Sequence, residues 1–154
     1  MCRHRGPRGS HGGRGGERGT GGAPSDRCRS VPRHPPRRIV SIWRDHIRML
    51  ASLAQVCVKL GGLGMAFCNF PSFLQSPPAS SAQLAAEWRP YIETCIEAFG
   101  ANRCMFESNF PVDMGSCTYA VLWNAFKVLA RHCSADEKAA LFSGTAQRVY
   151  RLKI

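Results

Sequence analysis

The chain has 154 residues, a formal net charge of +11 and 44% hydrophobic residues, which suits one folded domain with its own core. Nothing in the sequence resembles a membrane span of about 18 apolar residues or a secretory signal, so we expect neither a membrane protein nor a membrane partner. The eight cysteines form no Cys-x-x-Cys motif and have no histidine at metal-ligand spacing, so we expect reduced thiols in a cytoplasmic protein.

Residues 1–38 differ in composition from the rest of the chain. They contain ten Arg, nine Gly and five Pro, but no Phe, Tyr, Trp, Leu or Ile. Such a segment cannot bury enough apolar surface to offset the entropy cost of ordering it. We therefore predict a disordered N-terminal tail over 1–38 and a folded part over 39–154.

The charge of the tail leaves three interpretations open. Ten arginines face only Glu17 and Asp26 there, and residues 12–19 look like an RGG segment that could bind nucleic acid. The absence of stacking aromatic residues makes a nucleic-acid partner the disfavoured interpretation, and a solvated basic arm the favoured one. A misassigned start or a frameshift in GC-rich DNA would produce a similar tail.

Helix and strand alternate after the tail. Apolar residues at helical spacing predict a helix over 41–54, and a run rich in β-branched residues predicts a strand over 56–60. The glycine-rich run 61–64 has neither the Gly-x-Gly-x-x-Gly nor the Walker spacing. We therefore interpret it as a turn at a strand end that approaches another segment closely, rather than as a phosphate loop.

The next helix has clear end signals. Ser80 or Ser81 can cap its start, and Gly100 can end it. Its apolar positions fall at helical spacing between these residues. Pro90 lies inside the pattern, so we expect a kink or a break near Trp88.

A second strand is expected over 103–106, and three helical segments follow it. These are 119–129, a capped segment 134–144 that ends at its glycine, and a last turn over 145–152. Two strands joined by a crossover helix form a parallel βαβ unit, whose outer edges are unpaired. We therefore expect the folded part to be unstable alone or to self-associate.

Polar residues gather directly after the second strand. Glu107, Asn109 and Asp113 occupy the position where α/β folds bind their ligands, beyond the carboxyl ends of the strands. Asn109 either caps the loop with its side chain or orients substrate or water. Glu107 is either a solvated or salt-bridged acid or a catalytic carboxylate, and Asp113 is either a turn residue or that carboxylate.

Several ordered blocks of the folded part carry a family resemblance; they are 58–65, 88–91, 103–112, 141–146 and 149–152. Through these blocks the chain resembles the C-terminal portion of amidohydrolase-related proteins (amidohydrolase family 2), a group of predicted metal-dependent TIM-barrel hydrolases that includes sugar-lactone hydrolases. The resemblance implies an α/β fold that is a partial TIM barrel, with two βα units and terminal helices. The two strands would be the seventh and the eighth of the barrel.

The resemblance also implies a hydrolytic function, and it shows which of the family's catalytic residues this chain lacks. The intact relative would hydrolyse a small-molecule lactone, ester or amide, with a divalent metal such as zinc as an option. This chain has no His-x-His motif, and Asn109 stands where the family places an Asp. We therefore expect a C-terminal fragment that is inactive alone, with Asn109, Glu107 and Asp113 as the catalytic candidates. The alternative function is nucleic-acid binding or protein interaction through the tail.

Overall fold

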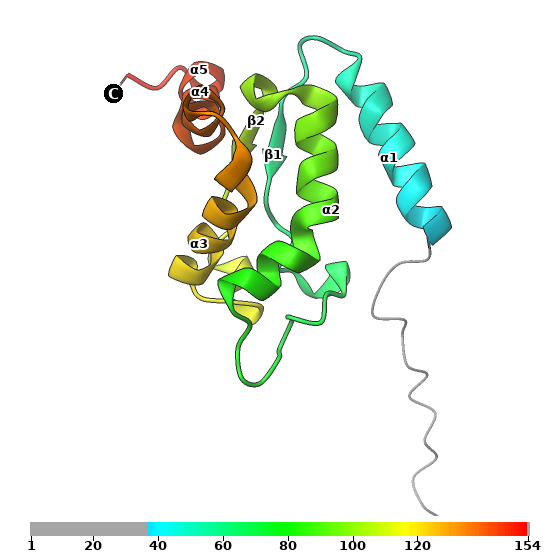
Figure 1. The fold of residues 1–154 in the computed structure, drawn as a ribbon, viewed down its shortest axis with the longest axis vertical. Coiled ribbons are helices and arrows are strands. Elements are labelled where there is room, and N and C mark those ends of the chain that lie inside the picture. Colours follow the sequence, from blue (N-terminus) through cyan, green and yellow to red (C-terminus); the bar gives the residue numbers. More distant parts are fainter. Residues whose placement is uncertain (1–36, 154) are drawn as a thin grey trace, which may run out of the picture. The chain divides into compact units, whose positions relative to one another are not determined.

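Two parallel strands joined by one long helix form the centre of the computed structural model, which describes residues 37–153 (Figure 1). Strand β1 (Val58–Leu60) pairs in parallel with strand β2 (Cys104–Phe106). The register places Val58 opposite Cys104 and Leu60 opposite Phe106. Helix α2 (Ser81–Phe99) connects them. The predicted parallel βαβ arrangement is confirmed, although both strands are shorter than expected because pairing is confined to three residues in each.

The ends of α2 follow the capping signals in the sequence. The side chain of Ser80 accepts a hydrogen bond from the Gln83 amide at 3.2 Å, and Gly100 follows the last turn with a φ of 77°. Pro90 lies inside the helix, yet the helix continues through it, and Figure 1 shows a bend rather than a break. Of the kink or break expected near Trp88, the helix therefore shows a bend and no break. Burial of the helix's apolar face compensates for the backbone hydrogen bond that proline cannot donate.

Helix α1 (Arg37–Ala51) begins two residues inside the segment assigned to the tail and ends before the expected residue 54. Residues 1–36 lie outside the described part of the chain, so the prediction of a disordered tail falls on residues that the structure does not describe. The guanidinium of Arg103 binds the C-terminal end of the helix. It donates hydrogen bonds to the carbonyl of Ala51 at 2.9 Å and to that of Leu53 at 3.0 Å. The same group also donates to the last carbonyl of α2 at 3.0 Å.

Helix α3 (Tyr119–Leu129) packs against α2 and completes the core over one face of the strands. Phe106 of β2 stacks on Phe126 of α3 with the ring centroids 4.5 Å apart, and Trp88 of α2 lies 6.1 Å from the same ring. All three side chains are buried. Burying each of them contributes about 1.5–3 kcal/mol to stability, so the aromatic positions are core, as their spacing predicts.

The C-terminal helices join without a break. Helix α4 (Ala135–Ala139) begins at the predicted capping box and passes through a π-helical turn (Ala140–Gly144) into helix α5 (Thr145–Tyr150). The expectation that Gly144 ends a helix is wrong, because this residue has helical angles and continues the chain into α5. Glycine at this place lets the turn widen around the carbonyl of Ala139, which a Cβ would approach to 3.2 Å.

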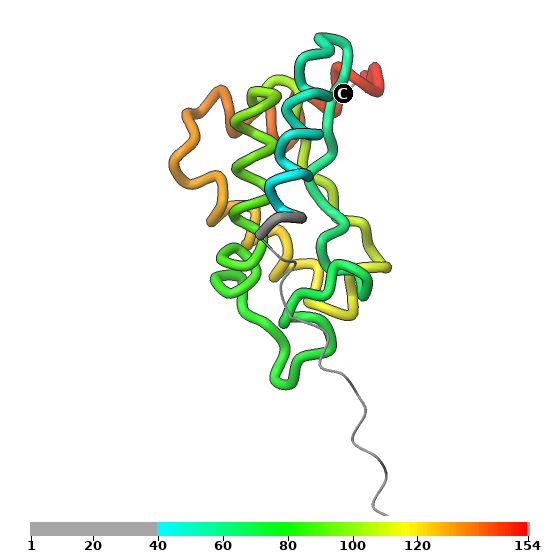
Figure 2. Tube along the Cα trace, turned by 90° about the vertical axis from the view of Figure 1, so that its right-hand side faces the viewer, coloured from blue at the N-terminus to red at the C-terminus, as the bar shows by residue number. Residues whose placement is uncertain are grey.

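The loops after the two strands lie at the same end of the molecule. In Figure 2 the segment after β1, in teal, runs beside the segment after β2, in yellow. Parallel strands make this arrangement necessary, because their carboxyl ends point the same way. Between residues 37 and 153 no helix has the length and the apolar character needed to cross a bilayer.

Candidate functional site

The glycine-rich loop after β1 packs directly on the loop after β2. A Cβ on Gly64 would lie 2.9 Å from both the Cβ and the Cγ of Asp113, and a Cβ on Gly61 would overlap the side chain and carbonyl of Glu107. Real side chains do not tolerate such contacts without a shift of the backbone. The interpretation of residues 61–64 as a close-approach turn is confirmed.

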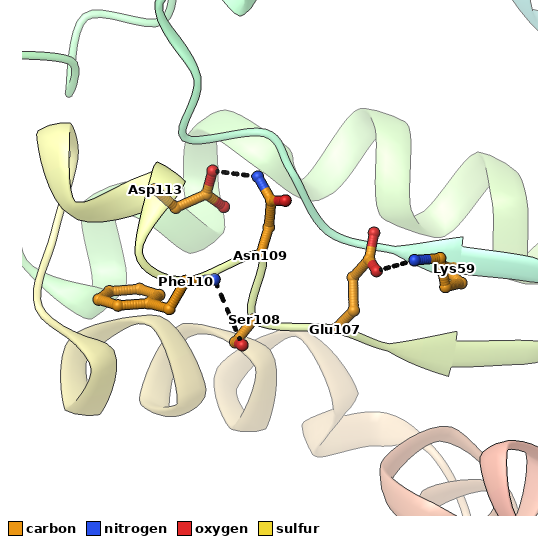
Figure 3. Close-up of polar contacts among 6 residues, drawn as sticks. All are labelled: Lys59, Glu107, Ser108, Asn109, Phe110 and Asp113. Carbon is orange, nitrogen blue, oxygen red and sulfur yellow. Dashed lines mark hydrogen bonds and ion pairs between the residues drawn. The ribbon is translucent and has the colours of Figure 1, made fainter.

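Asn109 and Asp113 face each other across the second loop (Figure 3). The Nδ2 of Asn109 donates to the Oδ1 of Asp113 at 2.9 Å, and the Asp113 amide donates to the Asn109 carbonyl at 3.3 Å. Asn109 has a φ of 49°, in the left-handed region that Asn tolerates better than most residues. The loop therefore turns back on itself and returns Asp113 to the end of β2.

The carboxyl group of Asp113 is fully buried. Its exposed fraction is 0%, and its Oδ2 has no hydrogen-bond partner among the described residues. Burial raises the pKa of this carboxyl, whereas the hydrogen bond from Asn109 and the amides of Gly64 and Gly62 act in the opposite direction. The negative charge of Glu107 adds a smaller upward effect on the pKa.

Glu107 is oriented differently from this pair. Its carboxylate forms an ion pair with the ammonium group of Lys59 on β1, as Figure 3 shows. The Glu107 side chain is 28% exposed and that of Lys59 is 52% exposed. The hydrogen bond and the charge of Glu107 raise the pKa of Lys59. Of the three candidate residues, the structure therefore brings Asn109 and Asp113 into contact and places Glu107 beside them in a separate pair.

Two residues of the site escaped the sequence analysis. Lys59 has a weak signal there, since it is the one charged residue inside an apolar strand. Ser116 has no such signal, yet its buried hydroxyl donates to the carbonyl of Gly64 at 2.9 Å and fixes the glycine loop from the other side. The loop is also held by the thiol of Cys68, which donates to the Gly62 carbonyl at 3.5 Å.

Burial keeps the thiols of Cys68, Cys95, Cys104 and Cys117 protonated. Six cysteines in the described part of the chain are free. Burial raises the pKa of Cys95 to about 11, that of Cys104 to about 12 and that of Cys117 to about 11. Burial also raises the pKa of Cys68, with a smaller contribution from Asp113. A protonated thiol is a poor nucleophile and a poor metal ligand, so these residues behave as small core residues.

The described residues do not form a metal site by themselves. No group of three or more His, Cys, Asp or Glu side chains within residues 37–153 is arranged to hold an ion. His46 on α1 and His132 after α3 are exposed on the outer surface. At the strand ends the donor set is one buried carboxylate, one amide and one carboxylate already paired with a lysine. This set suits hydrogen bonding and proton transfer rather than metal binding.

A cavity of about 370 Å³ lies elsewhere, between α1, α2 and β1. Its lining is mainly apolar and aromatic, with Trp43, Phe70 and Tyr91 among its members. Glu107, Asn109 and Asp113 are not part of the lining. The cavity therefore offers mainly apolar surface, and it adjoins the polar site at the strand ends, because Lys59 and Gly61 line it and also contact Glu107.

Comparisons with known proteins agree with the α/β fold. The family model described as amidohydrolase matches residues 31–152. An uncharacterized protein, y4mH, from Sinorhizobium fredii is 39% identical over 110 residues, which are 71% of this chain and 33% of that protein. An L-fucono-1,5-lactonase from Burkholderia multivorans is 32% identical over 123 residues, covering 71% of this chain and 35% of that enzyme.

Solved structures give the same picture. Crystal structures of an amidohydrolase from Burkholderia multivorans, one with bound HEPES and one with bound zinc, superpose on this chain with a TM-score of 0.63. The sequence identities are 29% and 30%, and the matches cover 74% of this chain and 38% of the crystallised chains. The chain therefore spans about a third of the length of the relatives that it matches.

Proposed function

Because the chain belongs to the amidohydrolase family, we propose that it carries the part of a hydrolase site in which Glu107, Asn109 and Asp113 meet at the ends of two parallel strands. One observation carries this proposal. The loops after β1 and β2 pack together, and they bring an amide, a buried carboxylate and a partly exposed carboxylate to the edge where α/β folds bind ligands.

The surrounding fold is proposed to be the last portion of a TIM barrel. The parallel βαβ unit and the TM-score of 0.63 over part of an amidohydrolase chain support this. In a complete barrel the two strands would be neighbours in a closed sheet, with α2 and α3 on its outer surface. The interior face of the strands, which carries Lys59, would then face the substrate.

The reaction that fits these groups is hydrolysis of a lactone, an ester or an amide. A water oxygen forms a bond to the acyl carbon, the bond from that carbon to the leaving oxygen or nitrogen breaks, and one proton passes from the water to the leaving group. Glu107 is the carboxylate placed to carry that proton, because it is partly exposed whereas Asp113 is buried. Asn109 orients the water or the substrate by hydrogen bonds.

Zinc is present in one of the matched crystal structures and remains a property of that protein. The described residues of this chain supply no set of ligands for it. No step proposed for this chain passes through a metal ion.

A chimera tests the proposed function. Residues 37–153 would replace the matching third of the L-fucono-1,5-lactonase from Burkholderia multivorans, and hydrolysis of L-fucono-1,5-lactone would be measured. We expect turnover that falls at least about tenfold in Asn109→Ala and Glu107→Gln variants, which corresponds to about 1.4 kcal/mol or more of lost transition-state stabilisation. The control is Asn124→Ala, an exposed asparagine on α3.

Two results would count against this function. One is a folded chimera without any turnover. The other is a chimera whose turnover is unaffected by substitution of Asn109 and Glu107 but depends on residues outside the two strand ends.

Two further properties are proposed. We propose that the protein works in the cytoplasm, since the six described cysteines are free. We propose that the chain self-associates through the unpaired edges of its two-stranded sheet, and the exposed side chains of Ile42 and Met49 on α1 add apolar surface. Nucleic-acid binding stays an untested alternative because it rests on the tail, and nothing in the comparisons supports it.

A further inference from the structure

We propose that Asp113 is a positioning residue that fixes the side-chain amide of Asn109, so that Asn109 presents its Oδ1 as a hydrogen-bond acceptor at the strand ends. This inference rests on the proposed function, because it assigns the division of labour within that site. It also predicts which atom of a ligand Asn109 recognises.

The carboxyl group of Asp113 is shielded from any ligand. Asp113 is 0% exposed, so in this structure a substrate cannot touch it. Its side chain accepts a 2.9 Å hydrogen bond from Asn109 Nδ2. Asn109 is half-buried and lies between the carboxyl group and the strand ends, so it is the side chain through which Asp113 can act on a bound molecule.

The second step is the direction of the bond. An ionised carboxylate only accepts hydrogen bonds, so the group of Asn109 that faces it must be the amide nitrogen. Figure 3 shows the consequence, with Nδ2 turned toward Asp113 and Oδ1 turned away from it. Without a carboxylate at 113, either end of the amide could take that place. Asp113 therefore selects one of two amide orientations.

The third step is the rigidity of Asp113 itself. Gly64 lies so close that a Cβ added to it would come within 2.9 Å of the Cβ and Cγ of Asp113, so the glycine loop restricts the side chain on that side. The hydroxyl of Ser116 holds the carbonyl of Gly64 at 2.9 Å, which keeps the glycine loop against the carboxyl group. A side chain locked by packing and by hydrogen bonds is a suitable support for a group that must hold one orientation.

The chemical consequence concerns the ligand. A fixed Oδ1 accepts a hydrogen bond from a water molecule, a hydroxyl group or an N–H group, and it does not stabilise a developing oxyanion. We therefore expect Asn109 to recognise the attacking water or a hydroxyl group of a polyhydroxylated substrate. A ligand with only acceptor atoms at that place would gain nothing from Asn109.

Nuclear magnetic resonance of the full chain tests the inference without any need for turnover. In a ¹⁵N-labelled sample the side-chain amide resonance of Asn109 should shift with pH, with a single midpoint above 3.8, because Asp113 titrates beside it and its pKa is raised. In the Asp113→Asn variant this shift should be lost. The matched control is Asp136→Asn, an exposed aspartate at the start of α4, which should leave the shift intact.

Other titratable groups near Asp113 do not confuse the result. These are Glu107 and the thiols of Cys68 and Cys117. Both thiols have raised pKa values and stay protonated in the acidic range. Glu107 remains in the Asp113→Asn variant, so a shift that survives this substitution would belong to Glu107 and would overturn the inference.

An exchange of the two residues separates positioning from a merely structural role. The double variant Asn109→Asp with Asp113→Asn restores one carboxylate and one amide at the same separation. We expect the side-chain amide resonance of position 113 to shift as the new carboxyl group at position 109 titrates. We also expect the urea midpoint of unfolding of the double variant to exceed those of both single variants. A double variant no better than the worse single variant would overturn the inference.

A second route covers the case in which Asp113→Asn does not fold. Asn109→Ala keeps the buried carboxyl group and removes its donor. The ¹³C resonance of the Asp113 carboxyl should then titrate at a higher pH than in the unmodified chain, because the hydrogen bond from Asn109 lowers its pKa. An unchanged midpoint would mean that Asn109 does not hold the carboxylate. Neither result depends on hydrolysis, so this inference can fail while the proposed function stands.

Discussion

Gly64 lies against the side chain of Asp113 so closely that a single added methyl group would come within 2.9 Å of its Cβ and Cγ. The two residues belong to different loops, one after each strand. Their contact is what joins those loops into one polar site. The backbone of the loop after β1 thus restricts where the only buried carboxyl group of the described part of the chain can lie.

Gly64→Ala should destabilise the protein by about 1–3 kcal/mol, because the new methyl group must displace Asp113 or the loop. Urea unfolding measures the loss, and the Asn109 side-chain amide resonance reports the displacement. Gly100→Ala is the control, since a Cβ there meets nothing within 4 Å and only the positive φ of 77° opposes it. That variant should leave the Asn109 resonance unchanged. Equal stability of Gly64→Ala and the parent chain would refute the contact.

Arg103→Ala should cost about 1.5–3 kcal/mol, because its guanidinium serves three carbonyl groups at the ends of two helices. Arg103→Lys is the informative comparison. An ammonium group keeps the charge but lacks the planar fork that reaches Ala51, Leu53 and Phe99 together. We expect lysine to recover less than half of the loss in urea unfolding. Full recovery by lysine would show that charge alone matters.

Lys59→Met should change the free energy of unfolding at neutral pH by no more than about 1 kcal/mol, because both partners of its ion pair are exposed to solvent. The pKa of Lys59 is raised by Glu107. The contribution of this pair is therefore present below the ordinary value of 10.5 and is lost as the pH rises through the raised pKa. Unfolding at pH 7 and at pH 11 tests both statements. A loss above about 2 kcal/mol at neutral pH would mean that the pair is far less hydrated than its exposure indicates.

Asp113 should make the free energy of unfolding depend on pH in the acidic range. The cause differs from that at Lys59, because burial here disfavours the charged form, whereas Glu107 favours the charged form of Lys59. Its pKa is raised above the ordinary 3.8, so the folded state holds the proton more tightly than the unfolded chain does. The resulting stability is fully present below pH 3.8 and declines as the pH rises through the raised pKa. Asp113→Asn should remove this decline. The measurement is the unfolding free energy between pH 3 and pH 6, with Asp136→Asn as the control.

The chain alone should hydrolyse no model lactone, and its thermal transition should be broad and depend on protein concentration. The reason is that its strand ends supply two carboxylates and an amide but no set of metal ligands among the described residues, and α1 exposes apolar side chains. Assays over a range of lactones together with calorimetry at several concentrations test this. A sharp, concentration-independent melt with metal-dependent turnover would contradict it.

The parts of the fold that follow local rules could be predicted from the sequence. Helix α2 starts at Ser80 and stops at Gly100 because a serine hydroxyl and a glycine with positive φ satisfy the free groups at helix ends. The capping box formed by Ser134 and Glu137 is confirmed for the same reason. These signals need no information from distant residues.

The parts that depend on distant residues could not be predicted. The end of α1 at Ala51 depends on Arg103, which lies 52 positions away. The burial of Asp113 depends on Gly64 in the loop after the other strand, and no local pattern encodes that contact. The three residue types at 107, 109 and 113 could be identified as candidates, whereas their pairing required the structure.

The attachment of α1 gives the molecule a defined point of opening. Of its side chains from Val40 onward only Ala51 is buried, and the guanidinium of Arg103 holds the end of the helix. A segment with so little buried area separates from its neighbours at a small free-energy cost while the rest stays folded. Amide hydrogens of α1 should therefore exchange with solvent long before those of α2, and proteases should cut α1 before α2.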